Sequence, residues 1–69
     1  MNFTLECEQE DDLRWLAVVP ELPGVLAYGS SRAHAITKAE ILALRVLADR
    51  LEHGEVTPLD IRISVPAAA

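Results

Sequence analysis

The sequence of 69 residues contains a single cysteine, Cys7, so no disulfide can form within the chain. A metal site has little support either, because one cysteine and two distant histidines, His34 and His53, match no common ligand spacing. A domain this small buries only about 60% of its unfolded surface and is marginally stable without further help. Self-association is the remaining source of stability. We therefore expect a homo-oligomer, either a dimer or a tetramer.

Long apolar runs and basic side chains are also scarce. No apolar run approaches the roughly 20 residues that span a bilayer, and the start, MNFTLECEQEDD, lacks the apolar core of a signal peptide. Eleven acidic residues outnumber six basic ones, which gives a formal net charge of −5. Such a chain is repelled by phosphate backbones and complements a basic protein. We expect a cytoplasmic protein with a basic protein partner, no membrane contact and no direct nucleic-acid binding.

Alternation of apolar and polar residues predicts three strands in the first half of the chain. Residues 2–9 alternate with a period of two, whereas residues 13–19 are apolar on both faces, which is typical of a central, doubly covered strand. A short strand follows at 25–28. Residues 20–24 interrupt the pattern, because prolines donate no ladder hydrogen bond and Gly24 suits a turn with positive φ. The side chains expected on the inner faces of the first two strands are Phe3, Leu5, Cys7, Leu13, Trp15, Ala17 and Val19.

One long helix is predicted from residue 32 to residue 53. Ser31 is the expected N-cap, Gly54 suits the position after the helix, and the interior contains no Gly or Pro. A final strand is expected at residues 59–65, where apolar and polar residues alternate again. Residues 66–69 are expected to form a tail.

The helix carries two apolar stripes. The first, expected on the sheet, consists of Ala35, Ala39, Leu42, Ala43, Val46 and Leu47. The second stripe consists of Ile41, Leu44, Ala48 and Leu51. With one helix on one sheet the second stripe faces water, which is typical of an interface. We predict it as the oligomer interface; the alternative is that a curled sheet or the tail covers it.

Together these elements predict one α+β domain over residues 1–69, with its core in residues 3–65. The element order is β-β-β-α-β. The first three strands form an antiparallel meander, and a right-handed crossover through the helix returns the last strand parallel to the first. We expect a four-stranded mixed sheet in the order 3-2-1-4, with one long helix on one face.

The segment from Trp15 to Ser31 carries the most specific pattern in the chain. It reads WLAVVPELPG up to Gly24, then YGSS before the Ala-rich helix. This segment resembles the HicB-like antitoxin family, whose members read W-x-A-x-V-P-[DE]-L-P-G, a short strand ending in Gly, and a capped helix. The resemblance covers residues 3–65 and implies a partial RNase H-like fold without nuclease activity. It also implies neutralisation of a small basic HicA-type toxin that cleaves messenger RNA.

Two features depart from that family pattern. Family members commonly carry a C-terminal DNA-binding segment, whereas this sequence ends at Ala69, directly after the last expected strand; we expect no operator binding. The first helical turn holds Arg32 and His34 where the family often has acidic residues. The alternative function is therefore a solitary HicB-like module that self-assembles or binds another protein, with no toxin partner and no DNA binding.

An RNase H-like fold also raises the question of a carboxylate metal site. The matching residues would be Glu6 or Glu8, Glu40 and Asp60, from the first strand, the helix and the last strand. The carboxylates on the two strands fall on their polar, solvent-facing sides, and Cys7 has no neighbouring base to activate it. We therefore expect no catalytic, metal-binding or cofactor-binding residue, and no enzyme.

The acidic turn between the first two strands is the main candidate for partner binding. Glu8, Glu10, Asp11 and Asp12 repel one another there and contribute little to stability. They are predicted to steer a basic partner toward the domain; the alternative is a solvated hairpin tip. The leading prediction is a non-catalytic antitoxin module that covers the RNA-binding surface of a HicA-like toxin, as a homo-oligomer.

Overall fold

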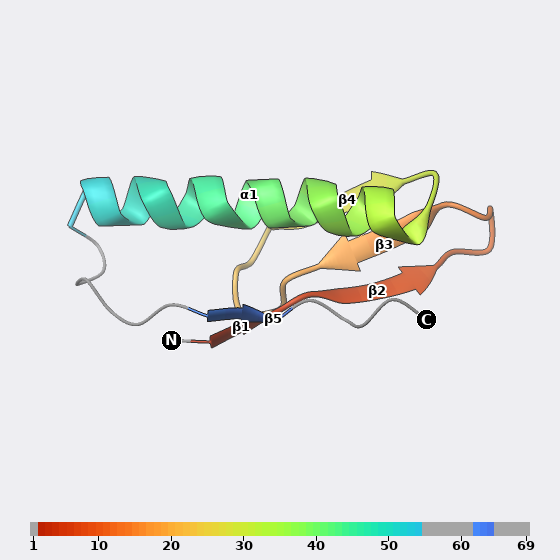
Figure 1. Cartoon of the computed structure of the whole chain (residues 1–69), viewed down its shortest axis with the longest axis horizontal. Coiled ribbons are helices and arrows are strands. Elements are labelled where there is room, and N and C mark those ends of the chain that lie inside the picture. Colours follow the sequence, from red (N-terminus) through yellow and green to blue (C-terminus); the bar gives the residue numbers. More distant parts are fainter. Residues whose placement is uncertain (1, 55–61, 65–69) are drawn as a thin grey trace.

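The computed structural model describes residues 2–54 and 62–64. In these residues one long helix lies along one side of the strands (Figure 1). The elements are β1 (Asn2–Thr4), β2 (Glu6–Gln9), β3 (Trp15–Val18), β4 (Leu26–Gly29), α1 (Arg32–Glu52) and β5 (Arg62–Ser64). The predicted α+β class is confirmed.

Strands β2, β3 and β4 form an antiparallel sheet with β3 in the centre. Cys7, Ala17 and Ala27 are direct partners across the three strands. The helix packs against this sheet, closest to β4 and β3. Its 21 residues make it about 31 Å long at 1.5 Å per residue, so its C-terminal half extends past the four-residue strands (Figure 1).

Strands β1 and β5 form a separate parallel pair, with Phe3 opposite Ile63. The predicted four-stranded sheet is therefore not found as one sheet in the described residues. Leu5 separates β1 from β2 and donates its N–H to the carbonyl of Ser64 over 2.9 Å. Within residues 2–54 and 62–64, β1 pairs with β5 and β2 pairs with β3, so the two ladders occupy different stretches of the first strand. Of the predicted last strand, residues 59–61 and 65 lie outside the described residues, as does the tail.

The core lies between α1 and the strands. Where the helix crosses the sheet, Ala17, Ala35, Ala39 and Ala43 are fully buried, and their small side chains allow the backbones to approach closely. Larger side chains fill the rest of the core: Phe3, Leu5, Val19, Leu22, Val25, Ile36 and Leu47. Trp15 packs against this cluster while partly exposed.

The helix is rolled about its axis relative to the predicted stripe. Leu42, expected in the core, is 37% exposed, whereas Ile36, not included in the prediction, is buried. Leu42 lies on the side of α1 next to the edge strand β4, where it lines a hollow of about 230 Å³ together with Ala27, Lys38 and Ile41. No further described strand lies beyond β4 to cover that side of the helix.

The connection between β3 and β4 is a tight turn with its own buried residue. Three backbone hydrogen bonds, each 3.0 Å long, close it. The Val19 N–H donates to the Val25 carbonyl, the Leu22 N–H donates to the Val19 carbonyl, and the Val25 N–H donates to the Leu22 carbonyl. Gly24 has a φ of 87°, as the turn prediction requires. This closed hydrogen-bond pattern turns Leu22 inward, where it is 1% exposed.

Candidate functional site

The outer face of the three-stranded sheet, turned away from α1, is acidic on one side and apolar on the other. Two cross-strand rows occupy it: Glu6, Val18 and Leu26, and then Glu8, Leu16 and Tyr28. Strand β2 supplies both carboxylates, and β3 and β4 supply the four large side chains. Leu26 is 46% exposed. We call these six residues the outer sheet face.

The tip of the β2–β3 hairpin adjoins this face and holds an exposed leucine. Glu10 N–H donates to the Arg14 carbonyl over 2.7 Å, and Leu13 N–H donates to the Glu10 carbonyl over 3.0 Å. This turn holds Leu13 at a φ of 73°, in the left-handed region that L-residues with side chains disfavour. Leu13 is also 72% exposed. An apolar side chain is therefore presented to solvent, in strained backbone geometry, among carboxylates.

Arg14 neutralises one carboxylate of the tip. Its backbone N–H donates to Asp12 Oδ1 over 3.1 Å and its Nε to Oδ2 over 2.7 Å. The backbone hydrogen bond, which has the larger effect, and the side-chain hydrogen bond both hold the pKa of the Asp12 carboxyl below its usual value. The Arg14 guanidinium also lies 4.3 Å from the ring centre of Tyr28. Arg14 thus connects the tip to the outer sheet face.

The predicted partner-binding residues are brought together in part. Glu10, Asp11 and Asp12 share the turn, with Glu10 half-buried and Asp12 bonded to Arg14, and the exposed Glu8 lies on the adjoining strand. The prediction placed Leu13 in the core, and the turn instead places it at the tip. Its signal in the sequence was a single apolar residue directly after four polar ones.

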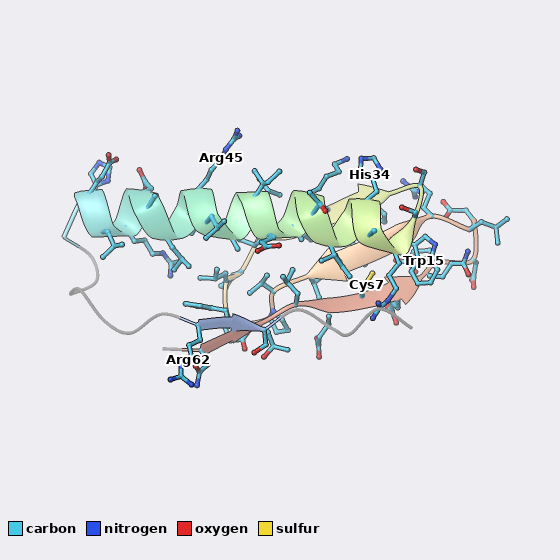
Figure 2. The ribbon with its side chains drawn as sticks, in the orientation of Figure 1. Cys7, Trp15, His34, Arg45 and Arg62 are labelled. Carbon is cyan, nitrogen blue, oxygen red and sulfur yellow. The ribbon has the colours of Figure 1, made fainter. Side chains whose placement is uncertain are left out.

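The second helical stripe is exposed, as expected for an isolated domain. Leu44 is 51% exposed, and Ile41, Ala48 and Leu51 are also exposed. Figure 2 shows Arg45, next to this stripe, pointing away from the strands. The structure therefore leaves the stripe uncovered by the described residues, and whether a second copy covers it remains a prediction.

The remaining reactive side chains do not converge in the described residues. Cys7 lies between β2 and α1 (Figure 2), where burial chiefly raises its thiol pKa, the charge of Arg32 opposes the shift and that of Glu8 adds to it. Glu40 is half-buried on the helix, whereas Glu6 and Glu8 lie on the opposite side of the sheet. Asp60 lies outside the described residues, and residues 2–54 and 62–64 hold no group of three potential metal ligands.

Neither the histidines nor the helix suggests another kind of site. His34 is exposed beside the N-cap, with Nδ1 3.4 Å from the Ser30 backbone nitrogen. His53 follows the last helical residue, with Nδ1 2.8 Å from the Asp49 carbonyl oxygen. Over the described part of the chain, no helix combines the length and apolar character needed to cross a bilayer.

Comparisons with models of protein families, with curated proteins and with solved structures find no match to this chain.

Proposed function

We propose that this chain is a non-catalytic, HicB-like antitoxin domain that binds a small basic HicA-type toxin and blocks its cleavage of messenger RNA. The observation that carries the proposal is the hairpin tip, where the exposed Leu13 stands among carboxylates beside the outer sheet face. The similarity of the WLAVVPELPG segment to that family supplies the identity of the partner.

The tip and the outer sheet face suit a basic protein on two grounds. Glu6, Glu8 and Asp11 are exposed carboxylates that attract a positively charged surface and raise the association rate. Leu13 and Leu26 offer apolar area next to them, and burial of such side chains at the centre of an interface supplies much of the binding energy. Covering the basic surface that holds RNA would inhibit the toxin without any chemical step.

The partial RNase H-like fold is part of the same proposal. In it, β1 and β2 act as one strand that is interrupted only at Leu5, and the Leu5 N–H bond to Ser64 keeps the last strand in place. The spatial order would then be β4, β3, β2 with β1, and β5, corresponding to 3-2-1-4. The antiparallel β2-β3-β4 sheet and the parallel β1–β5 pair support this arrangement.

The test uses the chain and a HicA-type toxin encoded beside it, with binding measured by calorimetry and activity by messenger RNA cleavage. We expect a fixed stoichiometry, inhibition of cleavage and weaker binding at high salt. Asp11→Lys and Leu13→Asn should each weaken binding about tenfold or more, the range of interface anchors. Glu21→Lys, an equal charge change in the β3–β4 turn beside Leu26, lies at the end of the sheet away from the hairpin tip and should weaken binding clearly less than Asp11→Lys.

Two outcomes would contradict this function. Undiminished cleavage in the presence of excess chain would exclude neutralisation, whatever the affinity. Equal losses for Asp11→Lys and Glu21→Lys would show that overall charge matters and the hairpin tip does not.

The second candidate is a solitary HicB-like module that self-assembles and binds no toxin or DNA. For this module the exposed stripe on α1 is the main binding surface, because four apolar residues on one helix face suit self-association irrespective of a toxin. We include homo-oligomer formation through this stripe in both candidates. A chain that forms a dimer yet ignores the toxin would select the solitary module.

A further inference from the structure

The exposed stripe on α1 has the spacing of a coiled-coil seam. Ile41, Leu44, Ala48 and Leu51 follow one another at intervals of three, four and three residues, which is the a/d repeat of two packed helices. All four are exposed, whereas Leu47, between them in sequence, is buried on the sheet side. The helix therefore uses one face for its own sheet and has a second, separate face for another helix.

The exposed polar residues along one side of this seam change sign along the helix. Lys38 and Arg45 flank its N-terminal half, and Asp49 and Glu52 flank its C-terminal half. All four are exposed. A helix with this charge distribution complements a copy of itself that runs in the opposite direction, because the basic half of each then meets the acidic half of the other.

We propose that two copies of this chain pair through α1 in an antiparallel arrangement about a two-fold axis that passes between Leu44 and Ala48, beside Arg45. In this arrangement Ile41 of one copy packs beside Leu51 of the other, and Lys38 approaches Glu52 of the other. Each such contact occurs twice, so the contact closes on itself as a dimer. The two Arg45 side chains meet near the axis, where Asp49 of the opposite copy lies within reach of each.

A parallel pair is the competing arrangement. It would bring Arg45 toward Glu40 of the second copy, but Glu40 is half-buried on its own domain. It would also leave Lys38 without an acidic neighbour and align the acidic C-terminal halves side by side. The charge distribution therefore favours the antiparallel pair.

The seam is short, so the expected dimer is weak. From Ile41 to Leu51 the helix rises only about 15 Å, so the four side chains bury much less than the roughly 800 Å² per partner of a standard interface. This inference rests on the self-association part of the proposed function and is independent of toxin binding. The experiment must therefore separate three questions: whether the chain forms a dimer, through which face, and in which direction.

The direction is tested with cysteine pairs in a Cys7→Ala background. Ile41→Cys and Leu51→Cys are prepared as two separate proteins and oxidised alone or as an equimolar mixture. The antiparallel pair predicts a disulfide-linked dimer only in the mixture, because each cysteine then faces the other variant. A linked dimer of either variant alone would show parallel pairing and overturn the proposal while leaving self-association intact.

The face is tested by sedimentation equilibrium up to about 1 mM, where even a dimer with a dissociation constant of about 1 mM is populated. Leu44→Glu should abolish the dimer, with its helix content by circular dichroism unchanged. Lys38→Glu and Glu52→Lys should each weaken the dimer about three- to tenfold, and the double exchange should restore it.

Other outcomes overturn the proposal at different levels. A wild-type monomer at every concentration would remove both self-association and the antiparallel pair. A folded Leu44→Glu variant that remains a dimer would place the contact on another face. Asp11→Lys serves as the control for toxin binding, since it should leave the dimer mass unchanged.

Discussion

Gly29 lies directly against the first turn of α1: a Cβ on Gly29 would stand 2.5 Å from the backbone nitrogen of Ala35 and 2.9 Å from its Cα. Both are backbone atoms, which cannot rotate away as a side chain can. Gly29 ends β4, and the helix begins three residues later. The absence of a side chain at this position therefore allows the helix to fold back over the strand that precedes it.

Gly29→Ala should destabilise the domain by about 1–3 kcal/mol, the usual cost of forcing extra atoms into a packed contact. Because a domain of this size has little stability in reserve, the variant should unfold at clearly lower urea concentration. Ser30→Ala, at the next and exposed position, is the control and should remain within about 0.5 kcal/mol of wild type. A Gly29→Ala variant as stable as the wild type would show that helix and strand separate easily.

Leu13→Asn should raise the free energy of unfolding by up to about 1 kcal/mol, because asparagine tolerates positive φ better than leucine. Little burial is lost, since Leu13 is mostly exposed. Leu13→Ala keeps the unfavourable backbone and should bring no such gain. Thermal unfolding of the three proteins separates these cases, and lower stability of Leu13→Asn would mean that the leucine makes a contact worth more than the strain. Together with weaker toxin binding, a gain in stability would identify Leu13 as a residue retained for function.

Leu22→Ala and Leu26→Ala should differ sharply although Leu22 lies within the β3–β4 turn and Leu26 directly after it. Leu22 is buried and Leu26 is about half exposed on the outer sheet face. Truncating the buried side chain should cost about 2–5 kcal/mol and leave the chain largely unfolded, whereas Leu26→Ala should cost less than about 1 kcal/mol. Urea unfolding measures both. Similar losses would mean that Leu26 is covered in solution.

Cys7 should react slowly with iodoacetamide in the folded domain and rapidly once urea unfolds it, because burial raises its pKa and disfavours the reactive thiolate. The same shift makes stability depend on pH. The folded state holds the thiol proton more tightly than the unfolded state does. The resulting contribution of Cys7 to the free energy of unfolding is complete below the pKa of the unfolded thiol, and it is lost as the pH rises through the pKa of the folded thiol. Cys7→Ala should lack this alkaline decline, which urea unfolding at several pH values measures. Equal reactivity of folded and unfolded protein would contradict the partly buried position of Cys7.

Local signals in the sequence predicted local structure well. Ser31 caps the helix as expected, accepting the His34 N–H on its Oγ over 3.1 Å. Gly24 takes the positive φ that its turn demands, and the helix ends next to Gly54. Each of these features depends on a few neighbouring residues, so a short stretch of sequence contains the whole cause.

Features that depend on distant contacts were harder to predict. Leu42, predicted in the core, is exposed, and Ile36, which the predicted stripe did not include, is buried, because the roll of a helix is set by the strand beneath it. Leu13 continued the alternation of its strand, but the hydrogen bonds of the hairpin closed the turn around it. Whether the first strand joins one sheet or two depends on Leu5 and Ser64, which are far apart in the sequence.

In the candidate site, too, the feature set by neighbouring residues was predictable and the feature set by distant contacts was not. The acidic turn was visible as a run of charged residues, whatever its geometry. The apolar half of the outer sheet face was not, because Leu16, Leu26 and Tyr28 become neighbours only through the register of β3 and β4. The charge that attracts a partner was thus predictable, and the apolar surface that would hold it was not.

The parallel pairing of β1 with β5 has a consequence for the order of folding. It joins residues about 60 positions apart, and closing so long a loop carries a large entropy cost before any contact compensates it. The β2-β3-β4 meander and α1 connect neighbours in sequence and can assemble first. We therefore expect the β1–β5 pair to form last and to open first. Hydrogen exchange at the Leu5 N–H would then be faster than at the Ala17 N–H. Strands β1 and β5 would separate while the β2-β3-β4 sheet and α1 remained folded.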